Sequence, residues 1–157
     1  MPSGHHRDDP AVRQAHEPDN RVHVMKIGIL GSGLMGGALG LALSQAGHDV
    51  AFSYARDQDK LERLARRANG TAVSVAQAVE RADVVLLAVH WSNLDDVLSR
   101  AGDLHEKTIM TCCVPLNAAN TQLVVGLKES GAELLARKVP EARIVAAFQT
   151  TPSEVFA

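Results

Sequence analysis

The chain has 157 residues, of which 46% are apolar, and its charges nearly cancel, with 16 Lys and Arg against 18 Asp and Glu. This length suggests one domain, and the balanced charge argues against a nucleic-acid-binding protein and against a polybasic membrane anchor. Because the sequence has neither an unbroken apolar run of about 18 residues nor an apolar signal core, we expect a cytoplasmic protein without a transmembrane span.

The first 24 residues differ in composition from the rest of the chain. They contain three of the six prolines and four of the seven histidines, and they show no apolar periodicity. We predict a disordered extension over residues 1–24 and one folded domain over residues 25–157.

From Met25 onward, segments with the apolar pattern of strands alternate with segments that have the pattern of helices. Strands are predicted at residues 25–30, 49–54, 71–74, 83–89, 108–114 and 143–148, and helices at residues 34–46, 57–68, 75–81, 94–101 and 127–138. The strand at 83–89 is apolar almost throughout, as expected when both faces are covered. This alternation requires right-handed crossovers and predicts an α/β fold with a doubly wound parallel sheet.

The sharpest motif is the glycine-rich run Gly31-Ser32-Gly33-Leu34-Met35-Gly36. It follows a predicted strand and opens a predicted helix, which is the setting in which this spacing binds the pyrophosphate of a dinucleotide. Gly31 allows the tight turn, Gly33 the approach of the pyrophosphate, and Gly36 the close packing of helix on strand. The N–H groups of the first helical turn and the helix dipole would then face the phosphates. The alternative is a closely packed helix start without a ligand.

The end of the second predicted strand indicates which dinucleotide binds. NAD-binding domains usually carry an acid there to bind the ribose 2′-hydroxyl, but residues 51–56 contain none. Arg56 could instead clamp the 2′-phosphate of NADP, with Ser53 adding a hydrogen bond and Lys60 a further charge. We therefore predict a preference for NADP. The alternative is that Arg56 and Lys60 are solvated charges and that Asp57 merely caps a helix.

With later segments included, the chain resembles the deazaflavin-dependent NADP oxidoreductases, which transfer a hydride between NADP and coenzyme F-420. The resemblance covers residues 25–157 and is carried by the glycine loop, Val89-His90-Trp91, Val114-Pro115-Leu116 and the closing run from Ala147 to Ala157. It implies a Rossmann-like dinucleotide-binding domain with NADP as cofactor and coenzyme F-420 as a candidate co-substrate. The residues expected to contact the cofactor are Gly31, Ser32, Gly33, Leu34, Met35, Gly36, Ser53, Tyr54, Arg56, Lys60, Val89, His90, Trp91, Val114, Pro115 and Gln149.

The chain departs from the pattern of this family at several positions. His90 stands where proline is usual, Gln149 where His or Asn is common, and Ala55 where a serine usually precedes the arginine, with Tyr54 as an apparent insertion. The chain also stops at Ala157, where related enzymes continue into a helical segment that helps to hold the deazaflavin and the dimer. A homodimer or a separate acceptor-binding subunit is therefore a candidate partner. Two alternatives remain open: a non-catalytic NADP-binding sensor or partner module, and a dehydrogenase domain like that of pyrroline-5-carboxylate reductases.

Few residues are candidates for catalysis. Direct hydride transfer needs positioning and exclusion of water rather than a protein acid, so no catalytic residue is assigned. His90 is the one candidate proton donor, and a loop histidine that packs or caps is the alternative. We interpret Cys112 and Cys113 as buried residues ending a strand, without metal-ligand spacing around them. The pair Asp95-Asp96 is interpreted as acids that favour the dipole of a helical first turn.

Overall fold

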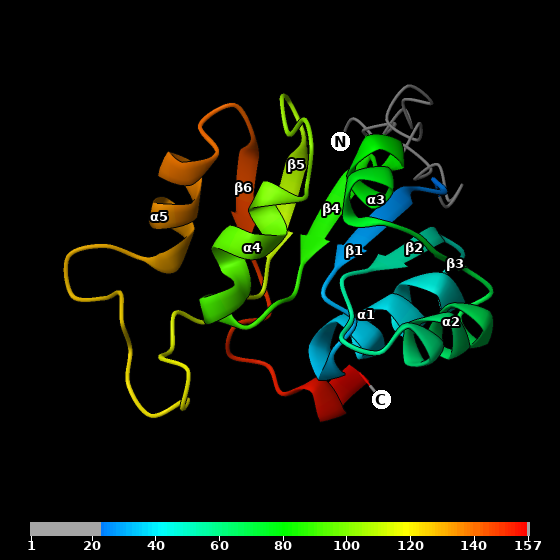
Figure 1. The fold of residues 1–157 in the computed structure, drawn as a ribbon, viewed down its shortest axis with the longest axis horizontal. Helices are drawn as coiled ribbons and strands as arrows, with labels where there is room; N and C mark the ends of the chain where they lie inside the picture. Colours follow the sequence, from blue (N-terminus) through cyan, green and yellow to red (C-terminus); the bar gives the residue numbers. More distant parts are fainter. Residues whose placement is uncertain (1–22, 157) are drawn as a thin grey trace, which may run out of the picture.

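The computed structural model describes residues 23–156, and Figure 1 shows a sheet with helices on both of its faces. Within these residues, six parallel strands are arranged in the order β3-β2-β1-β4-β5-β6. Their bounds are β1 Lys26–Leu30, β2 Asp49–Ser53, β3 Thr71–Ala72, β4 Val84–Leu87, β5 Thr108–Thr111 and β6 Arg143–Ala146. The strand order reverses between β1 and β4, which confirms the predicted doubly wound sheet. The predicted extension lies outside the described residues, except for its last two positions.

Two apolar clusters cover opposite faces of the sheet. On one face lie α1 (Leu34–Gln45) and α2 (Gln58–Arg67), and on the other lie α3 (Val75–Arg81), α4 (Leu94–Ser99) and α5 (Gly131–Lys138). Successive strand residues alternate between the clusters, so that Ile29 packs on the side of α1 and Leu30 on the side of α3. Both side chains are almost fully buried. Burial of both faces explains why the strands have continuous apolar sequences.

The last predicted helix begins later than the sequence pattern suggests. A helix is predicted over residues 127–138, but α5 begins at Gly131 because Ser130 and Glu133 form a capping box. The Ser130 hydroxyl accepts the Glu133 N–H at 3.1 Å, and the Glu133 carboxylate accepts the Ser130 N–H at 2.7 Å. Leu127 is fully exposed and has a left-handed backbone (φ +63°). The prediction is wrong at its start, since an apolar leucine was given more weight than the capping signal that follows it.

The other predicted elements are confirmed, with ends shifted by at most three residues. The largest shift is at β5, which ends at Thr111, before the two cysteines. A short 3-10 helix that the sequence pattern did not predict, η2 (Trp91–Asn93), separates β4 from α4. Among residues 23–156, no helix combines the length and apolar character needed to cross a bilayer.

The described chain ends beside α1. After β6 the chain turns at Phe148, whose backbone is left-handed (φ +64°), and continues to η3 (Ser153–Phe156). The rings of Phe148 and Phe156 pack edge to face with centroids 5.4 Å apart, and Phe156 also packs on the apolar cluster around α1. Figure 1 shows this segment running from β6 along the carboxyl ends of the strands to α1. The closing run thus follows the edge of the sheet at which ligands bind in such folds.

Both cysteines are free and buried, as the sequence predicts. The Sγ atoms of Cys112 and Cys113 lie 3.5 and 3.4 Å from the carbonyl oxygen of Leu87. Burial raises the pKa of Cys112 to about 12, and it also raises the pKa of Cys113. Both thiols are therefore held in the unreactive, protonated form.

We expect the two thiols of the folded chain to resist a disulfide reagent at pH 8. With a pKa of about 12 for Cys112, only about one thiol in ten thousand would be ionised, against about one in four for an ordinary cysteine. Release of thionitrobenzoate should be slow from the native chain and should reach two equivalents after unfolding in guanidinium. Rapid labelling of native protein would contradict the burial.

Candidate functional site

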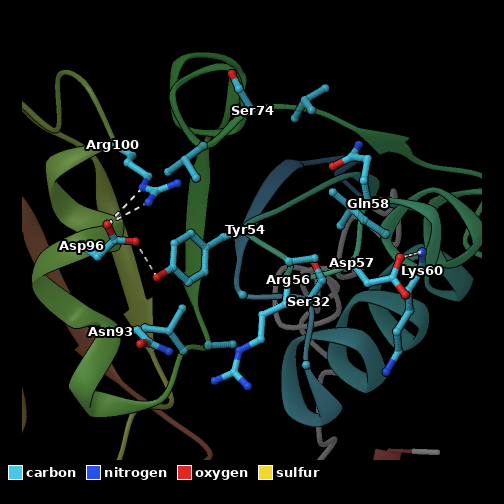
Figure 2. Close-up of a pocket in the computed structure, with 18 of the residues that line it drawn as sticks. Ser32, Tyr54, Arg56, Asp57, Gln58, Lys60, Ser74, Asn93, Asp96 and Arg100 are labelled. Atoms are coloured by element: carbon cyan, nitrogen blue, oxygen red, sulfur yellow. Dashed lines mark hydrogen bonds and ion pairs between the residues drawn. The ribbon is translucent and has the colours of Figure 1, made fainter.

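A cavity of about 930 Å³ lies at the carboxyl ends of β1, β2 and β4, where the strand order reverses (Figure 2). Its walls are the segments that follow successive strands: residues 31–33 after β1, residues 54–58, 60 and 61 after β2, residues 73–76 after β3, and residues 88–90 after β4. Asn93, Asp96 and Arg100 complete the wall on the side of α4. This is the place at which open α/β sheets bind their ligands.

The glycine loop has little freedom at two of its three glycines. Gly31 has φ +108°, and a Cβ there would collide with the carbonyl oxygen of Ala88 and lie 2.8 Å from Val89 Cγ1. A Cβ on Gly36 would collide with the carbonyl oxygen of Gly31. Gly33 differs, since its backbone is extended (φ −78°) and no atom lies within 4 Å of the place a Cβ would take. The structure itself therefore requires glycine at positions 31 and 36, while at position 33 a side chain would enter open space.

Side chains cap the N-termini of α2, α3 and α5, whereas α1 and α4 have no side-chain cap, and α4 continues directly from η2. Asp57, Ser74 and Ser130 cap α2, α3 and α5 with their side chains. No side chain in the described part of the chain caps α1, whose N-cap is Gly33. The first N–H groups of a helix have no partner within the helix, and they carry the positive end of its dipole. An anion of suitable size in the open space at Gly33 would satisfy them.

Arg56 and Lys60 line the cavity on the side of α2, and both are exposed. Figure 2 shows Asp57 between them, with its carboxylate directed at the backbone of Lys60. The Asp57 Oδ1 atom accepts the Lys60 N–H at 3.0 Å and so caps α2. The Asp57 carboxylate at this end of the cavity is therefore engaged in capping the helix.

Ser53 lies apart from these cations. Its side chain is fully buried, and its hydroxyl donates to the carbonyl oxygen of Ile29 at 2.8 Å. The Ser32 hydroxyl in turn donates to the Ser53 carbonyl oxygen at 2.9 Å. These bonds join the ends of β1 and β2, and Ser53 does not line the cavity.

His90 is held by hydrogen bonds at both ring nitrogens. Nδ1 accepts the backbone N–H of Ser92 at 3.2 Å and lies 2.8 Å from the Ser92 hydroxyl, while Nε2 lies 2.7 Å from Asn120 Oδ1. Because Nδ1 accepts a backbone N–H, the proton of the neutral ring belongs on Nε2, which donates to Asn120. His90 thus caps η2 and links it by a hydrogen bond to the loop that contains Asn120. The histidine therefore has the capping role that is the alternative to proton donation.

Half of the predicted contact residues line the cavity: Gly31, Ser32, Gly33, Tyr54, Arg56, Lys60, Val89 and His90. Leu34, Met35 and Gly36 form the first turn of α1 beside it. Trp91, Val114, Pro115 and Gln149 are half-buried and lie outside the cavity lining. The side chains of Trp91 and Pro115 both lie close to Gly131, at the start of α5.

A hydrogen-bond network that the sequence pattern does not predict joins Tyr54, just after β2, to α4. The Tyr54 hydroxyl donates to Asp96 Oδ2 at 2.7 Å, and Arg100 donates to Asp96 Oδ1 from Nη2 at 2.9 Å (Figure 2). The hydrogen bonds from Tyr54 and then Arg100 lower the pKa of Asp96, and burial and then the bond to Asp96 raise the pKa of Tyr54. The spacing of four residues between Asp96 and Arg100 indicates a pair on one helix, but no sequence pattern connects this pair with Tyr54, which follows β2.

No group of three or more His, Cys, Asp or Glu side chains within residues 23–156 is placed to hold a metal ion.

Comparison with known families gives a match to the family described as NADP oxidoreductase, coenzyme F420-dependent, over residues 26–115, which is more than half of the chain. Among solved structures, a protein of Arthrobacter sp. FB24 provisionally described as an F420-dependent NADP reductase is similar, with 23% identity and a TM-score of 0.73 over 83% of this chain and 65% of that one. The hypothetical protein SMa0349 of Sinorhizobium meliloti has 25% identity and a TM-score of 0.73 over 85% of this chain and 66% of that one.

More distant structures share the fold. An imine reductase from Pseudomonas sp. has 21% identity and a TM-score of 0.59 over 79% of this chain and 41% of its own. A reductive aminase from Aspergillus terreus, solved with NADPH, has 19% identity and a TM-score of 0.58 over 79% of this chain and 40% of its own. The present chain therefore spans just under two thirds of the first two structures and about two fifths of these reductases.

We expect Gly33→Ala to change the free energy of unfolding by less than about 0.5 kcal/mol. Alanine is a weaker N-cap than glycine, but it also reduces the entropy of the unfolded chain by about 0.4–1 kcal/mol, and the two effects nearly cancel at an open, extended position. Gly36→Ala, the matched control in the same loop, should lose several kcal/mol because its Cβ meets the Gly31 carbonyl. Urea denaturation measures both, and equal losses would contradict the open space at Gly33.

Proposed function

The chain belongs to the coenzyme F420-dependent NADP oxidoreductase family, and on that premise we propose that residues 25–157 bind NADP(H) in the cavity at the switch point and hold it for hydride transfer. The uncapped N-terminus of α1 beside open space at Gly33 is the observation that carries the proposal. The first N–H groups of this helix and its dipole can bind the pyrophosphate of a dinucleotide, and no side-chain cap has to be displaced.

The orientation of the dinucleotide follows from the position of its charges. With the pyrophosphate at Gly33, the adenosine half extends over the end of β2, as in other domains of this fold. Arg56 and Lys60 line that end of the cavity, and Asp57 there is engaged in capping α2. Two cations near a 2′-phosphate support NADP over NAD, since a charge-assisted hydrogen bond contributes about 1.5–3 kcal/mol.

The nicotinamide half then extends toward the carboxyl end of β4. Val89 and His90 line the cavity there, and the segment after β6 passes along the same edge of the sheet. When bound, NADPH supplies a hydride from its nicotinamide ring. His90 positions the surrounding loops through Ser92 and Asn120, and it carries no free ring nitrogen with which to move a proton. This arrangement suits an acceptor that takes a hydride directly, and we propose a deazaflavin such as coenzyme F-420, or a similar ring compound.

The proposal is tested by mixing the chain with NADPH and coenzyme F-420 and following NADPH absorbance together with deazaflavin reduction. We expect calorimetric binding of NADPH and a reduction rate proportional to the concentration of the chain. Binding without any reduction would identify a non-catalytic NADP-binding module, and a faster rate with a cyclic imine would favour a reductase of that substrate class. Absence of NADPH binding would contradict the proposal as a whole.

Arg56→Ala should weaken NADP binding by about 10- to 150-fold, because one charge-assisted hydrogen bond of about 1.5–3 kcal/mol is lost. Binding of NAD should change little, because NAD has no 2′-phosphate. Arg63→Ala is the matched control, since Arg63 lies on α2, is exposed and does not line the cavity. Calorimetric titration of each variant with both dinucleotides measures the effect. Parallel losses for NADP and NAD, or no loss, would show that another residue selects the phosphate.

A further inference from the structure

Tyr54 has a backbone conformation that is rare for an aromatic residue. Its φ of +58° lies in the left-handed region, which bulky side chains avoid. The surroundings fix this conformation from both ends, since the Tyr54 carbonyl accepts the Ser32 N–H at 3.4 Å and its hydroxyl donates to Asp96 Oδ2 at 2.7 Å. Strain that neighbouring groups maintain in this way is commonly found where a side chain must be held for a ligand.

Asp96 and Arg100 support the tyrosine ring from α4. Arg100 donates to Asp96 Oδ1 from Nε at 3.2 Å and from Nη2 at 2.9 Å, so that the two oxygens of Asp96 are divided between Arg100 and Tyr54. The guanidinium carbon of Arg100 lies over the ring, 5.7 Å from its centroid. Tyr54 is half-buried, because it also packs against the apolar cluster on the side of α3 and α4. It lines the cavity together with Asp96 and Arg100, so the part of its ring that remains exposed borders the cavity (Figure 2).

The position and chemistry of the Tyr54 ring are suited to stacking against a flat, neutral base. Aromatic residues make up only 3% of the chain, and Tyr54 is its single tyrosine. No phenylalanine or tryptophan is found among the described residues that line the cavity. Tyr54 follows β2 directly and precedes Arg56 by two residues, which places it at the adenosine end of the proposed site. Bases bind aromatic side chains by stacking, and they do so without needing hydrogen bonds.

We propose that Asp96 and Arg100 are positioning residues, which hold the ring of Tyr54 as the platform on which the adenine of the bound dinucleotide stacks. This inference rests on the proposed binding of NADP(H). Because the ring is fixed before the ligand arrives, stacking does not require a mobile side chain to be ordered on binding. The acid at position 96 therefore has a role at the site besides favouring the dipole of α4.

The first test compares affinities for adenosine 2′,5′-bisphosphate, which carries the base and the 2′-phosphate. Tyr54→Leu removes the platform and should weaken binding by about 5- to 150-fold. Asp96→Ala and Tyr54→Phe leave a ring that is less firmly held, and each should cost about 2- to 12-fold. The double variant should lose no more than either single variant, because both remove the same bond. Asp95→Ala is the matched control, since Asp95 pairs with Lys138 and lies outside the cavity lining.

The second test observes the ring itself. As the chain has one tyrosine, its ring protons give one set of NMR signals that needs no assignment by mutagenesis. Adenosine 2′,5′-bisphosphate should shift these signals by the ring current of adenine, whereas pyrophosphate, which lacks a base, should not. In Asp96→Ala, the shift on binding should be smaller, because the ring is no longer fixed. A purely structural role for Asp96 would leave the shift unchanged.

The outcomes separate this inference from the proposed function. If the parent chain binds NADP but all variants retain parental affinity, or the tyrosine signals do not respond to the base, the inference is overturned and the proposed function stands. If the parent binds neither NADP nor the bisphosphate, the proposed function fails first. Circular dichroism of Tyr54→Leu checks that it is folded, and Tyr54→Phe gives an independent result if it is not.

Discussion

The turn from β1 into α1 is the constraint on which the rest of the site depends. Gly31 must be glycine because of its left-handed backbone and its contact with the chain after β4, and Gly36 must be glycine because α1 begins against the carbonyl of Gly31. These contacts fix the start of α1 at the switch point, where its N-cap, Gly33, lines the cavity. The fold thus determines where an anion can bind before any side chain is considered.

The polar groups around this turn divide into two sets. Ser53 and Ser32 use their hydroxyls to join β1 and β2, Asp57 caps α2, and His90 caps η2. These groups satisfy buried or terminal backbone atoms, which would otherwise cost stability. The groups left to a ligand are the start of α1, the exposed cations Arg56 and Lys60, and the ring of Tyr54. These groups suit a ligand that has several phosphates and a flat base at one end, and NADP is such a ligand.

The fold could be predicted from the sequence because the apolar runs of the strands alternate with helical segments, and local patterns decide both. The site could be predicted only where it depends on local sequence, as for the glycine loop and Arg56. Hydrogen bonds between segments far apart in the sequence could not be predicted in this way. Tyr54 and Asp96 are 42 residues apart in the sequence, and His90 and Asn120 are 30 residues apart. The burial of Ser53 likewise depends on its pairing with β1, which gives its hydroxyl a backbone acceptor. At Leu127 the prediction is wrong for a different reason. An apolar residue is included in the predicted helix, whereas the capping box at Ser130 starts the helix after it.

The most direct test of the account is a titration of the isotope-labelled chain with NADP, followed by the backbone amide signals. If NADP binds as proposed, the largest shifts are expected at the N-cap Gly33 and at Leu34 and Met35, the first two residues of α1, because their N–H groups gain a phosphate as acceptor. Smaller shifts should appear after β2, at Tyr54 and Arg56. Saturation by NADP without a change at the start of α1 would contradict the account, since the dinucleotide would then be bound elsewhere on the chain.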